Sequence, residues 1–178
     1  FYTYGKGKLL GIYANAADAI RQANENQGLV VSESQKYVWE RGNRSLVYDI
    51  AGLDTSPYQE GNTLSAALNR IFSYEGKTVD VAGEMAAGKK PIEILKEQFP
   101  ENVLDLHGCS PEELCYILGK GTPIIAMTDL NNAVLLIGYN DSMITYVRPD
   151  TGEKVTVSYE ELEALTAASG NTYLGYLK

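Results

Sequence analysis

The order of two hydrophobic periodicities constrains the fold of this 178-residue chain most strongly. Between residues 63 and 118 apolar residues recur at helical spacing, most clearly at Leu64, Ala67, Leu68, Ile71 and Phe72. From residue 122 onward, short β-prone runs follow one another with turn signals between them. Helices followed by consecutive strands predict an α+β fold, with the helices packed on one side of an antiparallel sheet.

Single elements follow from the same patterns. Capping boxes at Ser110/Glu113 and Ser158/Glu161 mark the starts of two helices. We expect helices at 64–76, 80–87, 91–99, 109–118 and from 158 to about 170, and strands at 122–128, 133–139, 143–147, 154–157 and 172–177.

Residues 1–45 predict a small α+β unit of their own. It contains a strand at 8–13, a helix capped by Asn15 and a hairpin over 29–39. So few residues bury little core, and we therefore expect the unit to pack on a main domain of residues 46–178. That domain is predicted to begin with a strand over residues 45–50.

The charge balance argues against several classes of partner. The chain has 23 Asp and Glu against 15 Lys and Arg, a formal charge of −8, and no basic run. We therefore expect it to bind no nucleic acid. Because no apolar run approaches about 18 residues, we also expect no membrane insertion. The oligomeric state stays open. Since the chain begins at Phe1 rather than Met, we expect an excised or processed piece, with any signal peptide upstream.

Histidine and cysteine are scarce, with one His and two Cys. A zinc site needs more ligands at the right spacing, so we expect no metal and no cofactor. A nucleophile–histidine pair could use only His107, and Cys109 and Cys115 are the thiols near it in sequence. We favour a structural role for both thiols, because Cys109 precedes a helix cap and Cys115 lies on an apolar helix face. A reactive thiol is the alternative.

Two segments resemble a known family. Residues 62–68 read N-T-L-S-A-A-L and lead into I-F-S-Y-E-G at 71–76, while G-T-P-I-I-A at 121–126 precedes N-N-A-V-L-L-I-G-Y-N at 131–140. Together they resemble the bacteriocin-processing (double-glycine) cysteine peptidases and their secreted relatives. The resemblance covers about residues 46–177 and implies a papain-like fold, with N-terminal helices on a C-terminal antiparallel sheet.

The catalytic positions of that family are occupied by other residues here. Thr63 stands where the resemblance implies the nucleophilic Cys, and Asn132 where it implies the His base. The residue that orients the base falls at Arg148, with Asp150 as a shifted substitute. Gln59 is the nearest match to the glutamine of the oxyanion hole, although its spacing differs. A threonine hydroxyl needs a strong base to become a nucleophile, and Asn132 is not basic. Thr63 would then act as a helix cap, and Asn132 as part of a turn.

We therefore expect a peptidase-like domain without peptidase activity, which binds a peptide or protein. A ligand would lie along a cleft formed by Gln59, Asn62, Thr63, Asn132 and Tyr139. The resemblance implies an extracellular or cell-surface protein of a Gram-positive bacterium. Two alternatives remain: a cysteine-type hydrolase using Cys109 or Cys115 with His107, and a purely architectural domain.

Overall fold

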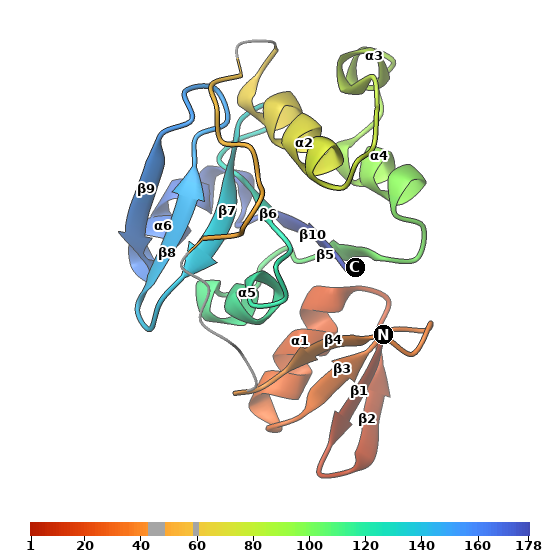
Figure 1. The fold of residues 1–178 in the computed structure, drawn as a ribbon. Helices are drawn as coiled ribbons and strands as arrows, with labels where there is room; N and C mark the ends of the chain where they lie inside the picture. The colour runs from red at the N-terminus through yellow and green to blue at the C-terminus, as the bar shows by residue number, and fades with distance from the viewer. Residues whose placement is uncertain (43–48, 59–60) are drawn as a thin grey trace.

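A computed structural model describes residues 1–42, 49–58 and 61–178, which form two antiparallel sheets and the helices around them (Figure 1). The N-terminal sheet has four strands in the order β2-β1-β3-β4, and α1 packs on one face of it. The elements of this N-terminal unit are β1 (Tyr2–Gly5), β2 (Lys8–Ile12), α1 (Ala16–Glu25), β3 (Leu29–Val31) and β4 (Tyr37–Glu40).

The main sheet has six strands in the order β5-β10-β6-β7-β8-β9, and each neighbouring pair is antiparallel. Its strands are β5 (Val103–Asp105), β6 (Ile124–Met127), β7 (Ala133–Tyr139), β8 (Met143–Val147), β9 (Lys154–Ser158) and β10 (Tyr173–Tyr176). The helices around it are α2 (Thr63–Tyr74), α3 (Val81–Ala86), α4 (Pro91–Gln98), α5 (Pro111–Leu118), α6 (Tyr159–Thr166) and the 3-10 turn η1 (Ala167–Ser169).

Helices cover both faces of the main sheet, so the expectation of helices on one side was wrong. All seven residues of β7 are buried, and successive side chains point to opposite faces. Leu135 and Ile137 join a core cluster with α2 and α4, whereas Val134 and Leu136 join a second cluster with α5 and α6. The cause is visible in the sequence: a strand that is apolar at every position needs a cover on each face.

Most elements form where their sequence signals lie. The capping boxes predicted for α5 and α6 are both present. Gly76 follows α2 with φ +66°, a left-handed conformation that glycine adopts without steric cost. β1 and β5 were missed. β1 is held by pairing with β2 and β3, and β5 by pairing with β10, and a search for local patterns does not detect such pairing. The strand predicted over 45–50 falls mostly outside the described residues.

The N-terminal unit packs on the main domain through α5. The indole Nε1 of Trp39 donates to the backbone oxygen of Glu113 at 3.1 Å, and Asn24 Nδ2 donates to the Glu113 carboxylate at 3.1 Å. Trp39 and Tyr116 lie with ring centroids 6.1 Å apart. Buried residues of α1, β3 and β4 belong to the same core cluster as α5. The two units therefore share one hydrophobic core.

Among the residues that the structure describes, none of the helices is both long enough and apolar enough to span a bilayer.

Candidate functional site

The start of α2 meets the turn between β6 and β7. Asn62 caps α2 by accepting a hydrogen bond from the Ser65 N–H, so Thr63 is the first residue of the helix and not its cap as predicted. The Thr63 hydroxyl donates to Asn132 Oδ1 at 3.1 Å and accepts from the Ala133 N–H at 2.9 Å. The structure thus brings together the two residues that the resemblance pairs.

Asp129 anchors Asn132 from within the same turn. Asn132 Nδ2 donates to both carboxylate oxygens of Asp129, at 3.1 and 3.0 Å, and its backbone N–H donates to Oδ1 at 2.9 Å. The hydrogen bond from the Asn132 side chain, followed by that from the Asn131 N–H, lowers the pKa of the exposed Asp129 carboxyl. The three side chains of Thr63, Asn132 and Asp129 therefore form a continuous hydrogen-bonded row.

Sequence reasoning missed Asp129, although a signal was present. An Asp placed two or three residues before the end of a turn commonly accepts hydrogen bonds from the backbone that follows it. Arg148 instead forms an ion pair with Glu153 at 3.4 Å, and the backbone oxygen of Asp150 accepts from the Tyr58 N–H. The contact expected of Arg148 or Asp150 is therefore made by Asp129.

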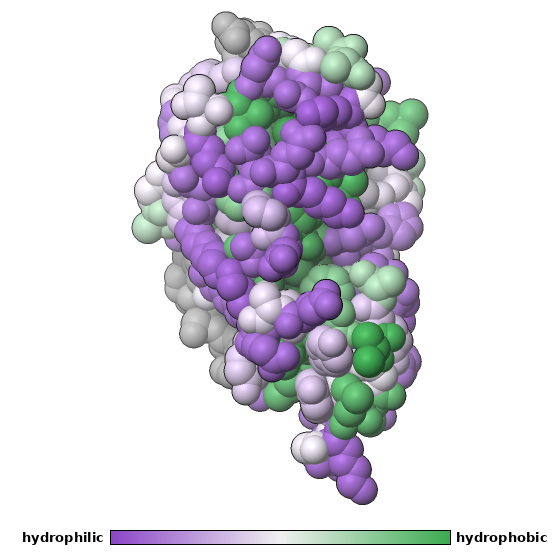
Figure 2. Space-filling view, turned by 90° about the vertical axis from the view of Figure 1, so that its right-hand side faces the viewer, coloured by the Kyte–Doolittle hydropathy of each residue, from purple (hydrophilic) through white to green (hydrophobic). Residues whose placement is uncertain are grey.

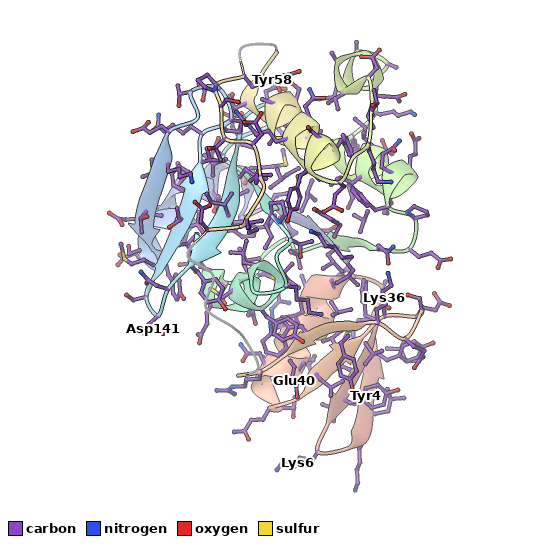
Figure 3. The ribbon with its side chains drawn as sticks, in the orientation of Figure 1. Tyr4, Lys6, Lys36, Glu40, Tyr58 and Asp141 are labelled. Atoms are coloured by element: carbon purple, nitrogen blue, oxygen red, sulfur yellow. The ribbon has the colours of Figure 1, made fainter. Side chains whose placement is uncertain are left out.

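The predicted cleft residues do not all lie together. Tyr139 is buried at the far end of β7, about seven residues and hence about 23 Å from Asn132. Figure 3 shows the two ends of the sheet, with Tyr58 near the start of α2 and Asp141 in the turn that follows Tyr139. Including Tyr139 in the cleft was wrong, because the rise per residue is greater along a strand than along a helix and seven strand residues span the whole sheet. Gln59 lies outside the described residues.

A buried arginine holds the backbone beside the site. Arg70 of α2 donates to the backbone oxygen of Pro149 at 2.8 Å and to the backbone oxygens of Asp54 and Ser56. Only 5% of Arg70 is exposed, and burial is the main cause that lowers the pKa of its guanidinium. Arg70 thereby ties the 54–56 segment and the turn after β8 to the same helix that carries Thr63.

The chemistry open to this arrangement follows from its hydrogen bonds. The Thr63 hydroxyl donates to an amide oxygen, which takes up no proton near neutral pH. Asp129 is one side chain further away, and its lowered pKa makes it a weak base. The arrangement can orient groups and exchange hydrogen bonds with a ligand, and it has an exposed surface at Asn132.

The two thiols and the histidine lie in separate surroundings. His107 is exposed, and its Nδ1 lies 3.0 Å from the hydroxyl of Thr172. Cys115 is fully buried, with its Sγ 3.3 Å from the Pro111 backbone oxygen and 3.4 Å from the Tyr159 hydroxyl. Cys109 is also buried, and burial raises the pKa of its thiol. Because a reactive thiol needs an accessible position, the burial of both thiols does not favour the alternative of a cysteine-type hydrolase.

The described residues also include His, Cys, Asp and Glu side chains, the types that commonly bind metal ions. No group of three or more His, Cys, Asp and Glu side chains lies close enough together there to hold a metal ion.

The similarity of this chain to known proteins is structural. No protein-family model matches it, and no curated protein is detectably similar in sequence. A solved structure assigned as a C39-like peptidase from Bacillus anthracis does match, with a TM-score of 0.59 and 18% sequence identity. The match covers 76% of this chain and 98% of that one. At this level of identity the likeness concerns the fold alone, and the chain therefore has the fold of a C39-like peptidase.

Proposed function

We propose that this chain is a non-catalytic, papain-like relative of the C39-like peptidases that binds a peptide or protein segment beside Thr63 and Asn132. The observation that carries the proposal is the hydrogen bond from the Thr63 hydroxyl to Asn132 Oδ1. In an active pair, the group in the place of Asn132 would remove the proton of the nucleophile, whereas an amide oxygen only accepts a hydrogen bond.

The second hydrogen bond of Thr63 supports the same proposal. Its oxygen already accepts the Ala133 N–H at 2.9 Å, so the lone pair that would attack a substrate is partly engaged. Asp129 holds the Asn132 side chain through two hydrogen bonds. Hydrogen bonds thus position the side chains of the site, which presents polar groups rather than a nucleophile to a bound segment.

The proposed ligand is a peptide or protein because the fold is that of a C39-like peptidase. A substrate-shaped surface can persist after catalytic side chains are replaced. We place the protein outside the cell or at its surface, on the strength of the sequence resemblance. The proposal requires no metal and no cofactor.

Two measurements test the proposal. The first is hydrolysis of a randomised peptide library, followed by mass spectrometry. We expect no cleavage, and cleavage that disappears in Thr63→Ala would overturn the non-catalytic assignment.

The second measurement is enrichment of displayed random peptides on the immobilised protein. Asn132→Arg fills the proposed site, and Ser142→Arg makes a similar change in the exposed turn after β7, at the other end of the sheet. We expect enriched peptides to lose binding to Asn132→Arg and to keep it with Ser142→Arg. Equal binding to both variants, or no enrichment at all, would contradict the proposed binding role.

A further inference from the structure

The N-terminal sheet presents an ordered apolar face on the side away from α1. Directly opposed residues of neighbouring antiparallel strands point to the same face. Thr3, Val30 and Trp39 are buried on the α1 side, and the Thr3 hydroxyl donates to the Ala19 backbone oxygen. The strand register places two complete rows on the other side, which we call the open face: Ile12, Tyr2, Val31 and Tyr37 in one row, and Leu9, Tyr4, Leu29 and Glu40 in the other.

Several large side chains of the open face are well exposed. The exposed fractions are 66% for Ile12, 58% for Tyr37 and 51% for Leu9. Figure 2 shows apolar residues gathered on the lower part of the molecule, over the N-terminal unit. A continuous apolar patch of this kind on a folded domain commonly marks an interaction surface.

The charge of the N-terminal unit differs from that of the whole chain. Residues 1–42 contain five Lys or Arg and four Asp or Glu, whereas the whole chain contains 15 and 23. The net negative charge therefore lies entirely outside residues 1–42. Two copies would repel each other least if their N-terminal units met and their main domains pointed away.

The edge of the open face carries charges of both signs. A hollow of about 410 Å³ on this face is lined in part by Lys6, Glu40 and Arg41. Glu33 lies near Tyr2 and Ile12, at the other end of the open face. An interface between identical copies needs complementary groups within a single surface, because each copy contributes the same patch. Lys6 and Glu40, which lie on one rim, provide one such pair of opposite charges.

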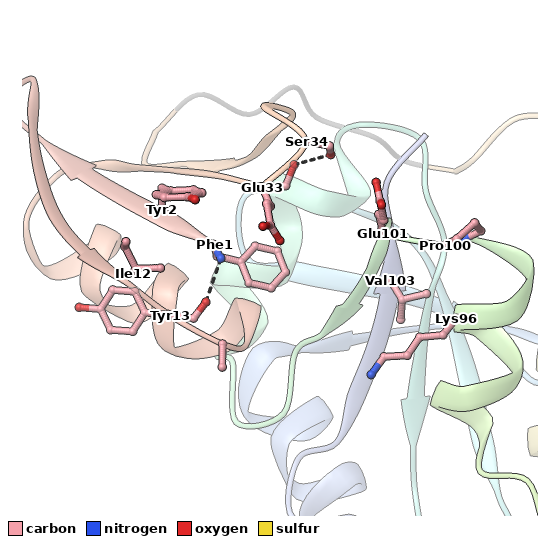
Figure 4. Close-up of a pocket in the computed structure, with 12 residues that line it drawn as sticks. Phe1, Tyr2, Ile12, Tyr13, Glu33, Ser34, Lys96, Pro100, Glu101 and Val103 are labelled. Atoms are coloured by element: carbon pink, nitrogen blue, oxygen red, sulfur yellow. Dashed lines mark hydrogen bonds between the residues drawn. The ribbon is translucent and has the colours of Figure 1, made fainter.

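The row that contains Tyr2 continues into a larger cavity of about 830 Å³. Figure 4 shows Tyr2, Ile12 and Tyr13 on one side of it and Lys96 and Val103 on the other. Ile12 lies in edge strand β2, at one end of this row, and Tyr37 lies in β4 at the opposite end. A two-fold axis parallel to the strands would place β4 of one copy over β2 of the other, so that Tyr37 meets Ile12 and the cavity.

We propose that the open face is a self-association surface that takes a second copy of this chain, packed sheet on sheet about the two-fold axis. Two sheets that pack face to face lie about 10 Å apart with interleaved side chains. The open face supplies eight side chains per copy, against about 20–30 residues per side in a standard interface. The dimer is therefore weak and depends on protein concentration.

The test is the mass of the chain in solution, measured by sedimentation equilibrium from about 1 µM to about 1 mM, which brackets the affinities of small interfaces. We expect the mean mass to rise toward that of a dimer. Ile12→Lys should weaken association at least about tenfold, since it places a lysine on each copy in the contact. Leu130→Lys makes the same kind of change at a residue that is 86% exposed in the turn between β6 and β7, and should leave association unchanged.

A monomer at every concentration would overturn the proposal and leave the open face to some other partner. Equal dimerisation of the wild type and Ile12→Lys would also overturn it, since association would then use another surface. Because Ile12 is mostly exposed, the variant should fold, and Tyr37→Ser gives a second, independent change at the other end of the row. Circular dichroism of each variant checks that the sheet is intact.

Discussion

The contact between Thr63 and Asn132 can be measured as a coupling energy. Thr63→Val keeps the shape of the side chain but removes its hydroxyl. The variant thereby loses the hydrogen bond donated to Asn132 Oδ1 and the one accepted from the Ala133 N–H. Each hydrogen bond contributes about 1 kcal/mol. Because Thr63 is only half-buried, we expect Thr63→Val to lower the free energy of unfolding by about 1–2 kcal/mol.

The double-mutant cycle with Asn132→Ala isolates the shared hydrogen bond. We expect a coupling energy of about 0.5–1 kcal/mol from urea unfolding of the wild type, both single variants and the double variant. Thr78→Val, the same change at an exposed position, should alter stability by less than about 0.5 kcal/mol. The reasoning would be refuted by additive effects, with a coupling below about 0.3 kcal/mol, because residues in direct contact should not behave as independent sites.

Three further outcomes are expected. The urea unfolding curve measured by the fluorescence of Trp39, the single tryptophan, should coincide with the curve measured by far-UV circular dichroism, because the two units share one core. Two separate transitions would show instead that the units unfold independently. Cys109 and Cys115 should react with a thiol reagent at neutral pH far more slowly in the native protein than in urea, because both are buried and burial raises the pKa of Cys109; rapid native labelling would contradict this. The pKa of Asp129 is lowered in the folded protein, so its stabilising contribution should be present above the ordinary carboxyl pKa and lost as pH falls through the lowered value. The difference in unfolding free energy between wild type and Asp129→Asn, measured by urea unfolding at several pH values, should therefore shrink in acid. A difference that does not depend on pH would contradict this prediction.

Sequence patterns predicted the elements better than their arrangement. Helix starts were found because their signals are local, as at the Ser110 and Ser158 capping boxes. The two-sided cover of the main sheet was missed, although the uninterrupted apolar run of β7 indicates it. Short strands such as β5 leave almost no periodic signal, because pairing with β10 rather than local propensity stabilises them.

At the candidate site, the sequence predicted the pairing of Thr63 with Asn132 but neither Asp129 nor Arg70, which hold the pair and the neighbouring backbone in place. Thr63 and Asn132 were placed by analogy with two motifs, and the structure brings them to 3.1 Å. Asp129 was not predicted, because the family pattern puts the orienting residue at Arg148 or Asp150 and not in the turn that contains Asn132. Arg70 looks like a surface residue in a helical pattern, since nothing local shows that three backbone oxygens from distant loops converge on it.

We propose that the chain retains the fold of a C39-like peptidase and carries Thr63 and Asn132 in the place of its two reacting groups. We would therefore restore those groups and measure the alkylation rate of the new thiol against pH, in Thr63→Cys and in Thr63→Cys/Asn132→His. Mass spectrometry distinguishes this thiol from the buried Cys109 and Cys115.

We expect the double variant to have a thiol pKa well below the ordinary value of about 8.5, because the thiol lies at the N-terminus of a twelve-residue helix and next to an imidazole. The single variant should stay closer to the ordinary value. If both variants show the same ordinary pH profile, position 132 does not face position 63 in the way that a catalytic pair requires, and the account would be contradicted.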